Sequence, residues 1–217
     1  MQYKKYDATK YNFAEHLKNK FGQTLEDLHN VTEDSNVIAD LKSQQHTKWH
    51  KIYYNNIRKS DFLRMYQQFV AEYVKPCFGE KQIVYQKVPT FRIQYPYNTA
   101  VAEFHKDSDY AHSKKEVNFF IPLTECKDTN AIWVETSAGS EKYKPMQSSF
   151  GEFVMWDGAN LKHGNKVSEE SWTRESFDFR VLTLEDYYEH EKDVLENNKQ
   201  SVVGGVPMLL GEYYVKL

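Results

Sequence analysis

The chain has 217 residues, 40% of them hydrophobic, and a formal net charge of −3. This length suits one domain with a full hydrophobic core. The small net charge, without a stripe of lysine or arginine, disfavours nucleic-acid binding. No apolar run approaches the ~20 residues that a membrane helix needs.

The ends and the cysteines indicate where the protein works. Residues 1–5 are basic but no apolar segment follows them, so they are not expected to form a signal peptide. Cys77 and Cys126 are too few for a disulfide scaffold. A reducing, cytoplasmic setting is therefore expected, with no membrane partner.

Residues 1–80 are expected to be mainly helical and to support the rest of a single domain spanning 1–217. Apolar residues recur at helical spacing in two stretches. Ser60 is expected to cap the second helix and Gly79 to end it. The polar stretch between the helices is expected to be loop with a short helix. The apolar positions are Phe13, Leu17 and Phe21 in the first helix, and Phe62, Tyr66, Phe69 and Tyr73 in the second.

Residues 83–184 carry a strand pattern. β-Branched and aromatic residues are enriched there and are bounded by Gly, Pro, Asn and Asp. About eight short strands in this space predict a sandwich or jelly roll. The expected strands are 83–88, 91–95, 99–104, 117–122, 132–135, 152–156, 161–163 and 174–182.

The last of these strands alternates sharply between polar and apolar residues. Residues 174, 176, 178 and 180 are polar and 177, 179 and 181 are apolar. Since alternate side chains share a face, one face is expected to line a polar interior and the other to pack on helices. Residues 185–217 are expected to form a C-terminal extension, a charged helix and then an apolar tail, which either packs on the barrel or closes over its mouth.

Two histidines and an aspartate form the strongest candidate for a metal site. His105 and Asp107 are two residues apart, so at the end of a strand both side chains can aim at one point. A distant strand would add His163. Two imidazoles and one carboxylate occupy one face of an iron(II) ion and leave the opposite face open.

Arg174 lies eleven residues after His163, and Ser176 shares its strand face. A guanidinium binds a carboxylate in bidentate fashion, and a hydroxyl adds a further donor. This pair suits the distal carboxylate of a dicarboxylic co-substrate.

The ordered set resembles the iron(II)/2-oxoglutarate-dependent dioxygenases. Residues 89–96, 117–124 and 156–165 are more narrowly similar to the streptomycin-biosynthesis hydroxylase-like branch, with phytanoyl-CoA hydroxylase a more remote relative. The resemblance covers roughly residues 83–183. It implies a mainly β fold, a cupin-like double-stranded β-helix (jelly roll) over 83–184 supported by the N-terminal helices.

The resemblance also implies an activity. Iron(II) would be bound by His105, Asp107 and His163, and 2-oxoglutarate by Arg174 and Ser176. With O2, such an enzyme hydroxylates an unactivated C–H bond of a small polar molecule, such as a sugar, cyclitol or amino-acid-like compound, and releases succinate and CO2. The same ligands serve desaturation, ring closure and epimerisation, which stay open as alternatives.

Further residues are expected to line the site. Asn118 is expected to bond 2-oxoglutarate, and Gln94 and Arg92 share a strand face that borders the cavity. The candidates for substrate contact are Trp133, Glu135, Asn165 and His112.

Several of these residues have a simpler interpretation. His105 could be a core histidine, Arg174 part of a surface ladder, and Glu135 a support for the loop at 136–137. Asp109 is the rival carboxylate, whereas Arg180 is expected to pair with Asp178. The remaining histidines are expected to be solvated: His16, His29, His46, His50 and His190.

Two other functions are open. A cupin-like metal isomerase or epimerase would share the histidines but has no use for Arg174 and Ser176. A non-catalytic jelly-roll module that binds carbohydrate would not need all four groups. The identity of the substrate and the oligomeric state, a homodimer being one option, do not follow from the sequence.

Overall fold

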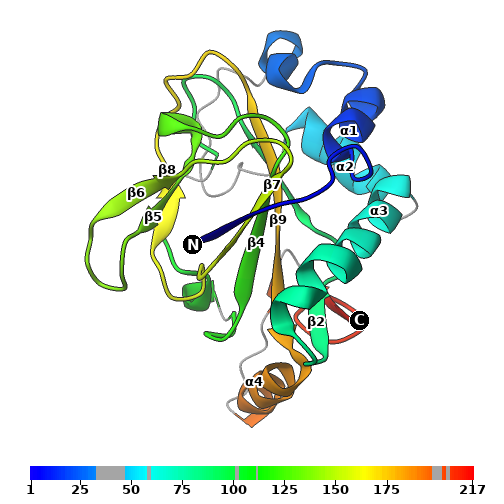
Figure 1. Cartoon of the computed structure of the whole chain (residues 1–217). Coiled ribbons are helices and arrows are strands. Elements are labelled where there is room, and N and C mark those ends of the chain that lie inside the picture. Colours follow the sequence, from blue (N-terminus) through cyan, green and yellow to red (C-terminus); the bar gives the residue numbers. More distant parts are fainter. Residues whose placement is uncertain (33–46, 58–59, 101–102, 111, 197–201, 204–205) are drawn as a thin grey trace.

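The computed structural model describes residues 1–32, 47–57, 60–100, 103–110, 112–196, 202–203 and 206–217. These residues form mainly antiparallel β-structure with a few helices, as the sequence predicts (Figure 1). The principal helices are α1 (Phe13–Phe21), α2 (Lys48–Ile57), α3 (Asp61–Phe69) and α4 (Leu184–Glu196), with short helical turns η1 (Leu25–Val31), η2 (Val70–Val74), η3 (Lys75–Phe78), η4 (Asp107–Tyr110) and η5 (Asp128–Asn130).

The strands form a large sheet, a small sheet and a short C-terminal ribbon. The large sheet has the order β1-β7-β4-β9-β2-β12, with β3 also pairing with β9, and the small sheet has the order β6-β5-β8. The strands are β1 (Gln2–Lys5), β2 (Ile83–Gln86), β3 (Thr90–Gln94), β4 (Val117–Pro122), β5 (Ile132–Glu135), β6 (Tyr143–Met146), β7 (Glu152–Trp156), β8 (His163–Asn165), β9 (Arg174–Thr183), β10 (Val202–Val203), β11 (Val206–Pro207) and β12 (Tyr214–Lys216).

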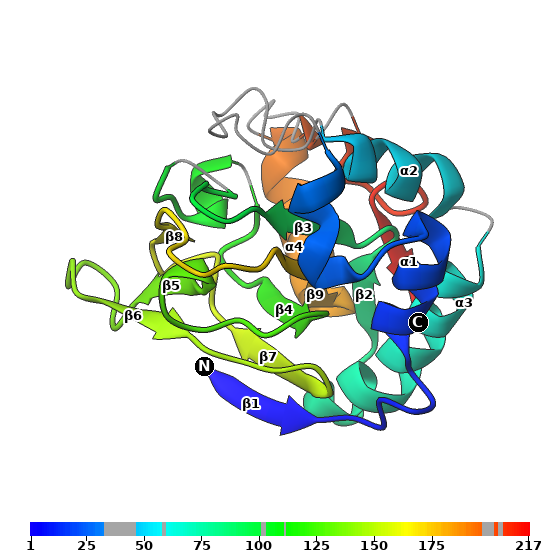
Figure 2. The same cartoon turned by 90° about the horizontal axis from the view of Figure 1, so that it is seen from above.

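The large sheet lies between the small sheet and the N-terminal helices. Figures 1 and 2 show β5, β6 and β8 on one side of it and α1, α2 and α3 on the other. The helices therefore cover one face of the large sheet, and its other face is turned toward the small sheet.

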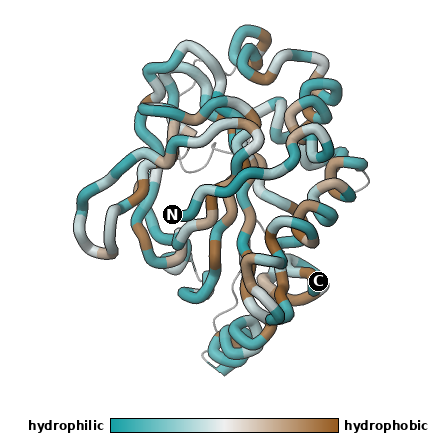
Figure 3. Tube along the Cα trace, in the orientation of Figure 1, coloured by the Kyte–Doolittle hydropathy of each residue, from teal (hydrophilic) through white to brown (hydrophobic). Residues whose placement is uncertain are grey.

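The alternation of β9 separates these two environments. Phe177 and Phe179 are fully buried on the helix side, where Phe177 lies 5.0 Å from Phe13 and Phe179 lies 5.0 Å from Tyr66 between ring centroids. Figure 3 shows the hydrophobic residues concentrated in the central strands and in the helices beside them. The polar residues of β9 point between the sheets, as predicted.

The two N-terminal helices form as their sequences predict. Phe13, Leu17 and Phe21 are the buried residues of α1. The Ser60 side chain accepts a hydrogen bond from Leu63 N at the start of α3, which satisfies one of the unpaired N–H groups of a helix start. Gly79, with φ of +58°, follows the helical run at its end.

Five strands were absent from the sequence prediction: β1, β6, β10, β11 and β12. β1 and β6 are edge strands, in which Lys and Pro are common, and both lack a period-2 apolar pattern. β12 comes after a Gly-containing turn and pairs with β2. Conversely, no strand forms at 99–104 among the described residues. Instead, His105 makes an isolated bridge to His163.

The C-terminal tail packs on one end of the large sheet. Met208, Tyr213 and Tyr214 form a buried cluster with Val84 and Leu182. Of the two alternatives expected for the tail, packing or closing over the mouth of the barrel, the structure shows packing. Within the described part of the chain, no helix is long and apolar enough to cross a membrane.

The Phe177 ring should be a main support of the interface between the sheet and the helices. Phe177→Ala would leave a cavity against Phe13 and Phe62, and we expect it to lower the free energy of unfolding by about 3–5 kcal/mol. The control is Leu195→Ala, because that side chain is 71% exposed. Urea unfolding measures both changes, and a loss below about 1 kcal/mol for Phe177→Ala would contradict this packing.

Candidate metal centre

His105, Asp107 and His163 meet between the two sheets. Their nearest ligand atoms all lie within 4.8 Å of one another. Asp107 Oδ1 lies 3.7 Å from His105 Nε2 and 3.6 Å from His163 Nε2. This geometry suits one metal ion held by all three side chains, and the three residues are those that the sequence predicts.

Backbone pairing holds the two histidines side by side. His105 N donates to His163 O at 2.9 Å, and His163 N donates to His105 O at 2.8 Å. The Nδ1 atoms lie 3.0 Å from backbone carbonyls, those of Glu103 and Leu161. Because a carbonyl only accepts, each Nδ1 is assigned the proton, which leaves Nε2 as the ligand atom.

The two oxygens of Asp107 have different surroundings. Oδ1 faces the histidines, whereas Oδ2 accepts hydrogen bonds from Asn118 Nδ2 at 2.7 Å and from Arg180 Nε and Nη2 at 3.1 and 3.0 Å. Oδ2 is therefore fully occupied by the protein. Asp107 is presented to a metal as a monodentate ligand.

Glycine at position 158 keeps this arrangement in place. The Asn118 side-chain oxygen accepts from Gly158 N at 3.2 Å, and Asp107 N donates to Gly158 O at 3.0 Å. A Cβ at position 158 would lie 2.7 Å from Asn118 Cγ. Only glycine allows this close approach without displacing Asn118.

The charges around the centre favour metal-binding protonation states. Burial lowers the pKa of His163 to about 4, so the imidazole is neutral near pH 7. Burial alone would raise the pKa of Asp107. The charge of Arg180, the two nearby histidines and the hydrogen bond from Asn118 together outweigh this effect and hold the pKa well below its usual range. The site therefore presents neutral imidazole and an ionised carboxylate.

A line of alternating charges leads from Asp107 along β9. Arg180 contacts Asp107 at 3.0 Å and Asp178 at 2.6 Å, and Arg92 Nε contacts Asp178 at 2.8 Å. The expected Arg180–Asp178 pair is present. Its link to the metal ligand was not predicted, because the sequence does not show that Arg180 reaches Asp107.

Arg174 lies in a second polar cluster between the sheets. Its guanidinium donates to Asn130 O at 3.1 Å, to Ser176 Oγ at 2.9 Å and to Gln94 Oε1 at 3.1 Å. Asn165 Nδ2 also reaches Gln94 Oε1, at 3.3 Å. Asn165 is two residues from His163 on β8, so the cluster adjoins the metal centre.

Arg174 has no ionic partner in the described part of the chain. The side chain is 1% exposed, yet no described carboxylate lies within 4.0 Å of its guanidinium. Glu175 follows it in sequence but points to the opposite face of β9. A buried cation without an opposite charge is costly, so this site calls for an anion.

The other predicted residues take varied places. The Asn118 amide is committed to Asp107 and Gly158, so it holds the metal ligand instead of making the expected contact with 2-oxoglutarate. The Glu135 carboxylate accepts from Glu141 N and Lys162 N, which agrees with the loop-supporting alternative. Lys166 lies over the Trp133 ring at 3.3 Å. His112 bonds Glu116.

The structure also shows the places of Asp109, the rival carboxylate, and of His50, one of the other histidines. Asp109 accepts from Lys106 N and lies outside the metal-binding group. His50 was expected to be solvated, but it is 1% exposed and packs edge-on against Phe91. The apolar face of α2 carries it into the core. His46 lies outside the described residues.

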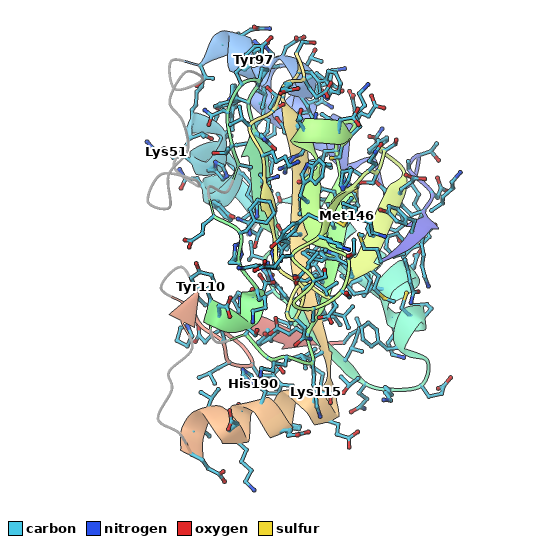
Figure 4. All side chains as sticks on the ribbon, turned by 90° about the vertical axis from the view of Figure 1, so that its left-hand side faces the viewer. Lys51, Tyr97, Tyr110, Lys115, Met146 and His190 are labelled. Atoms are coloured by element: carbon cyan, nitrogen blue, oxygen red, sulfur yellow. The ribbon has the colours of Figure 1, made fainter. Side chains whose placement is uncertain are left out.

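His105 is the most exposed of the three residues. The His105 side chain is 20% exposed, compared with 3% for Asp107. Tyr110, which is 53% exposed, lies 5.3 Å from the His105 ring and stands on η4 at the surface in Figure 4. Tyr110 therefore flanks the exposed side of the His105 imidazole.

Removing one imidazole should abolish metal binding without unfolding the protein. We expect His163→Ala to show no saturable binding of cobalt(II), measured by visible absorption, because two ligands remain of three. His16→Ala, on α1, should bind as the unmodified protein does. Unchanged binding in His163→Ala would disprove the ligand assignment.

Arg180 should act on the metal through Asp107. Arg180→Lys keeps a charge but loses the two-nitrogen contact with Oδ2, and we expect metal affinity to fall about 10- to 100-fold. Calorimetry with cobalt(II) measures this change. Arg64→Lys, in an exposed pair with Asp61, is the matched control, and equal affinities in the two variants would contradict the role of Arg180.

The chain is similar to several known proteins, in structure and in sequence. No family model matches it. Among solved structures, a nickel complex of the non-heme monooxygenase ThoJ aligns with 88% of this chain and 92% of its own at 11% identity and a TM-score of 0.45. The structure of AviO1 from Streptomyces viridochromogenes aligns with 82% of this chain and 86% of AviO1, at 14% identity and a TM-score of 0.44. At these identities and TM-scores, neither structure assigns a function to this chain.

The sequence comparison is decisive. The chain is 31% identical over 212 residues to the streptomycin biosynthesis protein StrG of Streptomyces griseus, and the alignment spans 97% of this chain and 95% of StrG. This agrees with the narrower resemblance carried by residues 89–96, 117–124 and 156–165. The chain belongs to the family of the streptomycin biosynthesis protein StrG.

Proposed function

We propose that this protein is an iron(II)- and 2-oxoglutarate-dependent oxygenase that hydroxylates a C–H bond of a small polar molecule. One observation carries the proposal: the buried guanidinium of Arg174 has no carboxylate partner in the described residues and adjoins a two-histidine, one-carboxylate centre. A dicarboxylic co-substrate would supply the missing charge.

The donor set fits iron(II). Two neutral imidazoles and one monodentate carboxylate form a set that leaves positions on the metal open. His105, Asp107 and His163 would hold the ion through Nε2, Oδ1 and Nε2. Arg180 and Asn118 prevent Asp107 from using its second oxygen.

The Arg174 cluster fits the distal carboxylate of 2-oxoglutarate. The guanidinium offers charge-assisted donors, and the hydroxyl of Ser176 lies 2.9 Å from Nη1. Gln94 and Asn130 fix the plane of the guanidinium, so that it is oriented before a ligand arrives. Burial lowers the pKa of Arg174, and an anion beside it would oppose that effect.

When bound, iron and 2-oxoglutarate supply the oxidising chemistry, with O2 consumed and succinate and CO2 released. The protein's own groups bind and orient. Arg174 and Ser176 set the position of the co-substrate, and Arg180 keeps Asp107 ionised. Trp156, whose ring is 4.6 Å from that of His163 at 90°, excludes water from that side of the centre.

The proposed scaffold is a double-stranded β-helix (jelly roll). It is supported by two opposed antiparallel sheets, of which β8 contributes His163 and β9 contributes Arg174. A small-molecule substrate is supported by the name of StrG, which assigns that protein to the biosynthesis of streptomycin. A metal isomerase or a binding module would leave the charge of Arg174 unexplained.

The proposal is tested by succinate release. Protein supplied with iron(II), 2-oxoglutarate and O2 should form succinate slowly on its own and faster with a substrate. Chelation of the metal should stop the reaction, and so should His163→Ala. Absence of any metal-dependent succinate, in protein that binds iron, would disprove the 2-oxoglutarate assignment.

Arg174 should control the affinity for the co-substrate. Arg174→Gln removes the charge but keeps an amide that can reach Ser176, and we expect the Kd of 2-oxoglutarate to rise about 10- to 100-fold, the loss of a charge-assisted contact. Calorimetry under anaerobic conditions measures it. Lys166→Gln, beside the Trp133 ring, is the control for loss of a cation. An unchanged Kd in Arg174→Gln would contradict the role of Arg174 as the anchor.

A further inference from the structure

Arg92 lies on the inner face of the large sheet. Its neighbours on β3, Phe91 and Ile93, are buried in the core that the helices cover. Since alternate side chains of a strand point to opposite faces, Arg92 points toward the small sheet. Gln94 shares this face, and Asn165 of β8 donates to it at 3.3 Å. Arg92 therefore belongs to the polar interior between the two sheets.

The fold uses one of the three guanidinium nitrogens of Arg92. Nε donates to Asp178 Oδ1 at 2.8 Å, and neither terminal nitrogen makes a hydrogen bond to a residue that the structure describes. The other oxygen of Asp178 accepts from Arg180 Nη1 at 2.6 Å. Asp178 therefore orients the guanidinium through Nε and leaves the two terminal nitrogens for another acceptor.

Arg92 is accessible to a ligand, unlike Arg174. The Arg92 side chain is 20% exposed, whereas Arg174 is 1% exposed. A guanidinium that is mostly buried attracts an oxyanion more strongly than one on the surface, because the surroundings screen the charge less. Arg92 combines this partial burial with access from solvent.

The pairing of β3 with β9 places Arg92 beside the metal centre. Arg92 lies opposite Ser176, and residues directly opposite in an antiparallel pair share a face. Its partner Asp178 contacts Arg180, which in turn contacts the metal ligand Asp107 at 3.0 Å. Arg92 is therefore next to the proposed co-substrate anchor on one side and connected to the metal ligand on the other.

The charges along this line leave Arg92 with the least compensation. Arg180 is paired with two carboxylates, those of Asp107 and Asp178, whereas Arg92 shares Asp178 with Arg180. A metal ion on Asp107 would compete with Arg180 for that carboxylate, so Arg180 would depend more on Asp178. An oxyanion at the terminal nitrogens of Arg92 would restore the balance.

The co-substrate is not the source of this anion. In the proposed function one carboxylate of 2-oxoglutarate is assigned to Arg174 and the other to the metal, so the anion at Arg92 belongs to another molecule. The planar fork of a guanidinium matches two oxygens of a carboxylate or a phosphate. A neutral hydroxyl group would leave the charge uncompensated.

We propose that the terminal nitrogens of Arg92 bind a carboxylate or phosphate group of the substrate, which is therefore a small anionic molecule. This inference rests on the proposed function, because it names the substrate class for the same site. Arg92 determines specificity, and Asp178 is a positioning residue that acts through Nε.

Sulfate is the probe, because it is an oxyanion with the shape of phosphate. It is titrated, at constant ionic strength, into protein loaded with diamagnetic zinc(II) and saturated with 2-oxoglutarate. NMR follows the Nε–H signal of Arg92, identified by its loss in Arg92→Lys, and calorimetry gives the Kd. We expect a saturable shift of this signal, and a Kd that rises about tenfold in Arg92→Lys because the two-nitrogen contact is lost.

Two controls isolate the role of the terminal nitrogens. Arg64→Gln removes an exposed arginine that pairs with Asp61, and it should bind sulfate as the unmodified protein does. Arg92→Lys keeps a charge for Asp178, so it should stay folded, which thermal unfolding verifies. Its Kd for 2-oxoglutarate should be unchanged.

The outcomes distinguish the two proposals. No saturable shift of the Arg92 signal, or equal sulfate affinity in Arg92→Lys, would overturn the anion site. Displacement of 2-oxoglutarate by sulfate, or weaker 2-oxoglutarate binding in Arg92→Lys, would assign Arg92 to the co-substrate and also overturn it. If the zinc-loaded protein binds no 2-oxoglutarate but sulfate still shifts the Arg92 signal, the proposed function fails and the anion site stands.

Discussion

The site depends on the way in which Asp107 is shared. One carboxylate oxygen faces two imidazoles, and the other accepts three hydrogen bonds from Asn118 and Arg180. A buried carboxylate is stable only when it is paired. The pairing with Arg180 therefore allows an ionised ligand to exist between the sheets and fixes which oxygen a metal can reach.

This constraint extends through β9 to the core. Arg180 also binds Asp178, and Arg92 binds Asp178 from β3, so the charges along the strand alternate in sign and nearly cancel. On the opposite face, Phe177 and Phe179 pack on the helices. A shift of one residue in the register of β9 would reverse both faces. The aromatic core therefore also sets the geometry of the metal centre.

Arg174 differs from these groups because no carboxylate among the described residues forms an ion pair with it. It is held by neutral acceptors, a carbonyl, a hydroxyl and an amide oxygen. A protein that needed only structure from this position could place an apolar side chain there at no charge penalty. The arrangement suits a strand that delivers a cation to an anionic ligand.

Much of this was readable from the sequence. The alternation of residues 174–181 predicted both faces of β9, and the spacing of His105, Asp107 and His163 predicted which side chains meet. Helix starts and apolar periods were also local signals, as at Ser60 and Phe13.

Other features depend on tertiary structure. The commitment of Asn118 to Asp107, and the second contact of Arg180, arise from the pairing of β4 with β9, in which Asn118 lies opposite Arg180. The strands β1, β6 and β12 lie at sheet edges, where the apolar pattern is weak. The dyad of His112 and Glu116 has helical spacing but forms in a loop, and Tyr214 completes it from 98 residues away.

The most direct test of the account is the visible absorption spectrum of the protein under strict anaerobiosis with iron(II) and 2-oxoglutarate. Chelation of iron by the keto acid, at a centre made by His105, Asp107 and His163, should give a weak lilac charge-transfer band that needs both additions. The band should require a higher 2-oxoglutarate concentration in Arg174→Gln. If the protein binds iron but no band forms at saturating 2-oxoglutarate, the proposal that it uses this co-substrate is wrong.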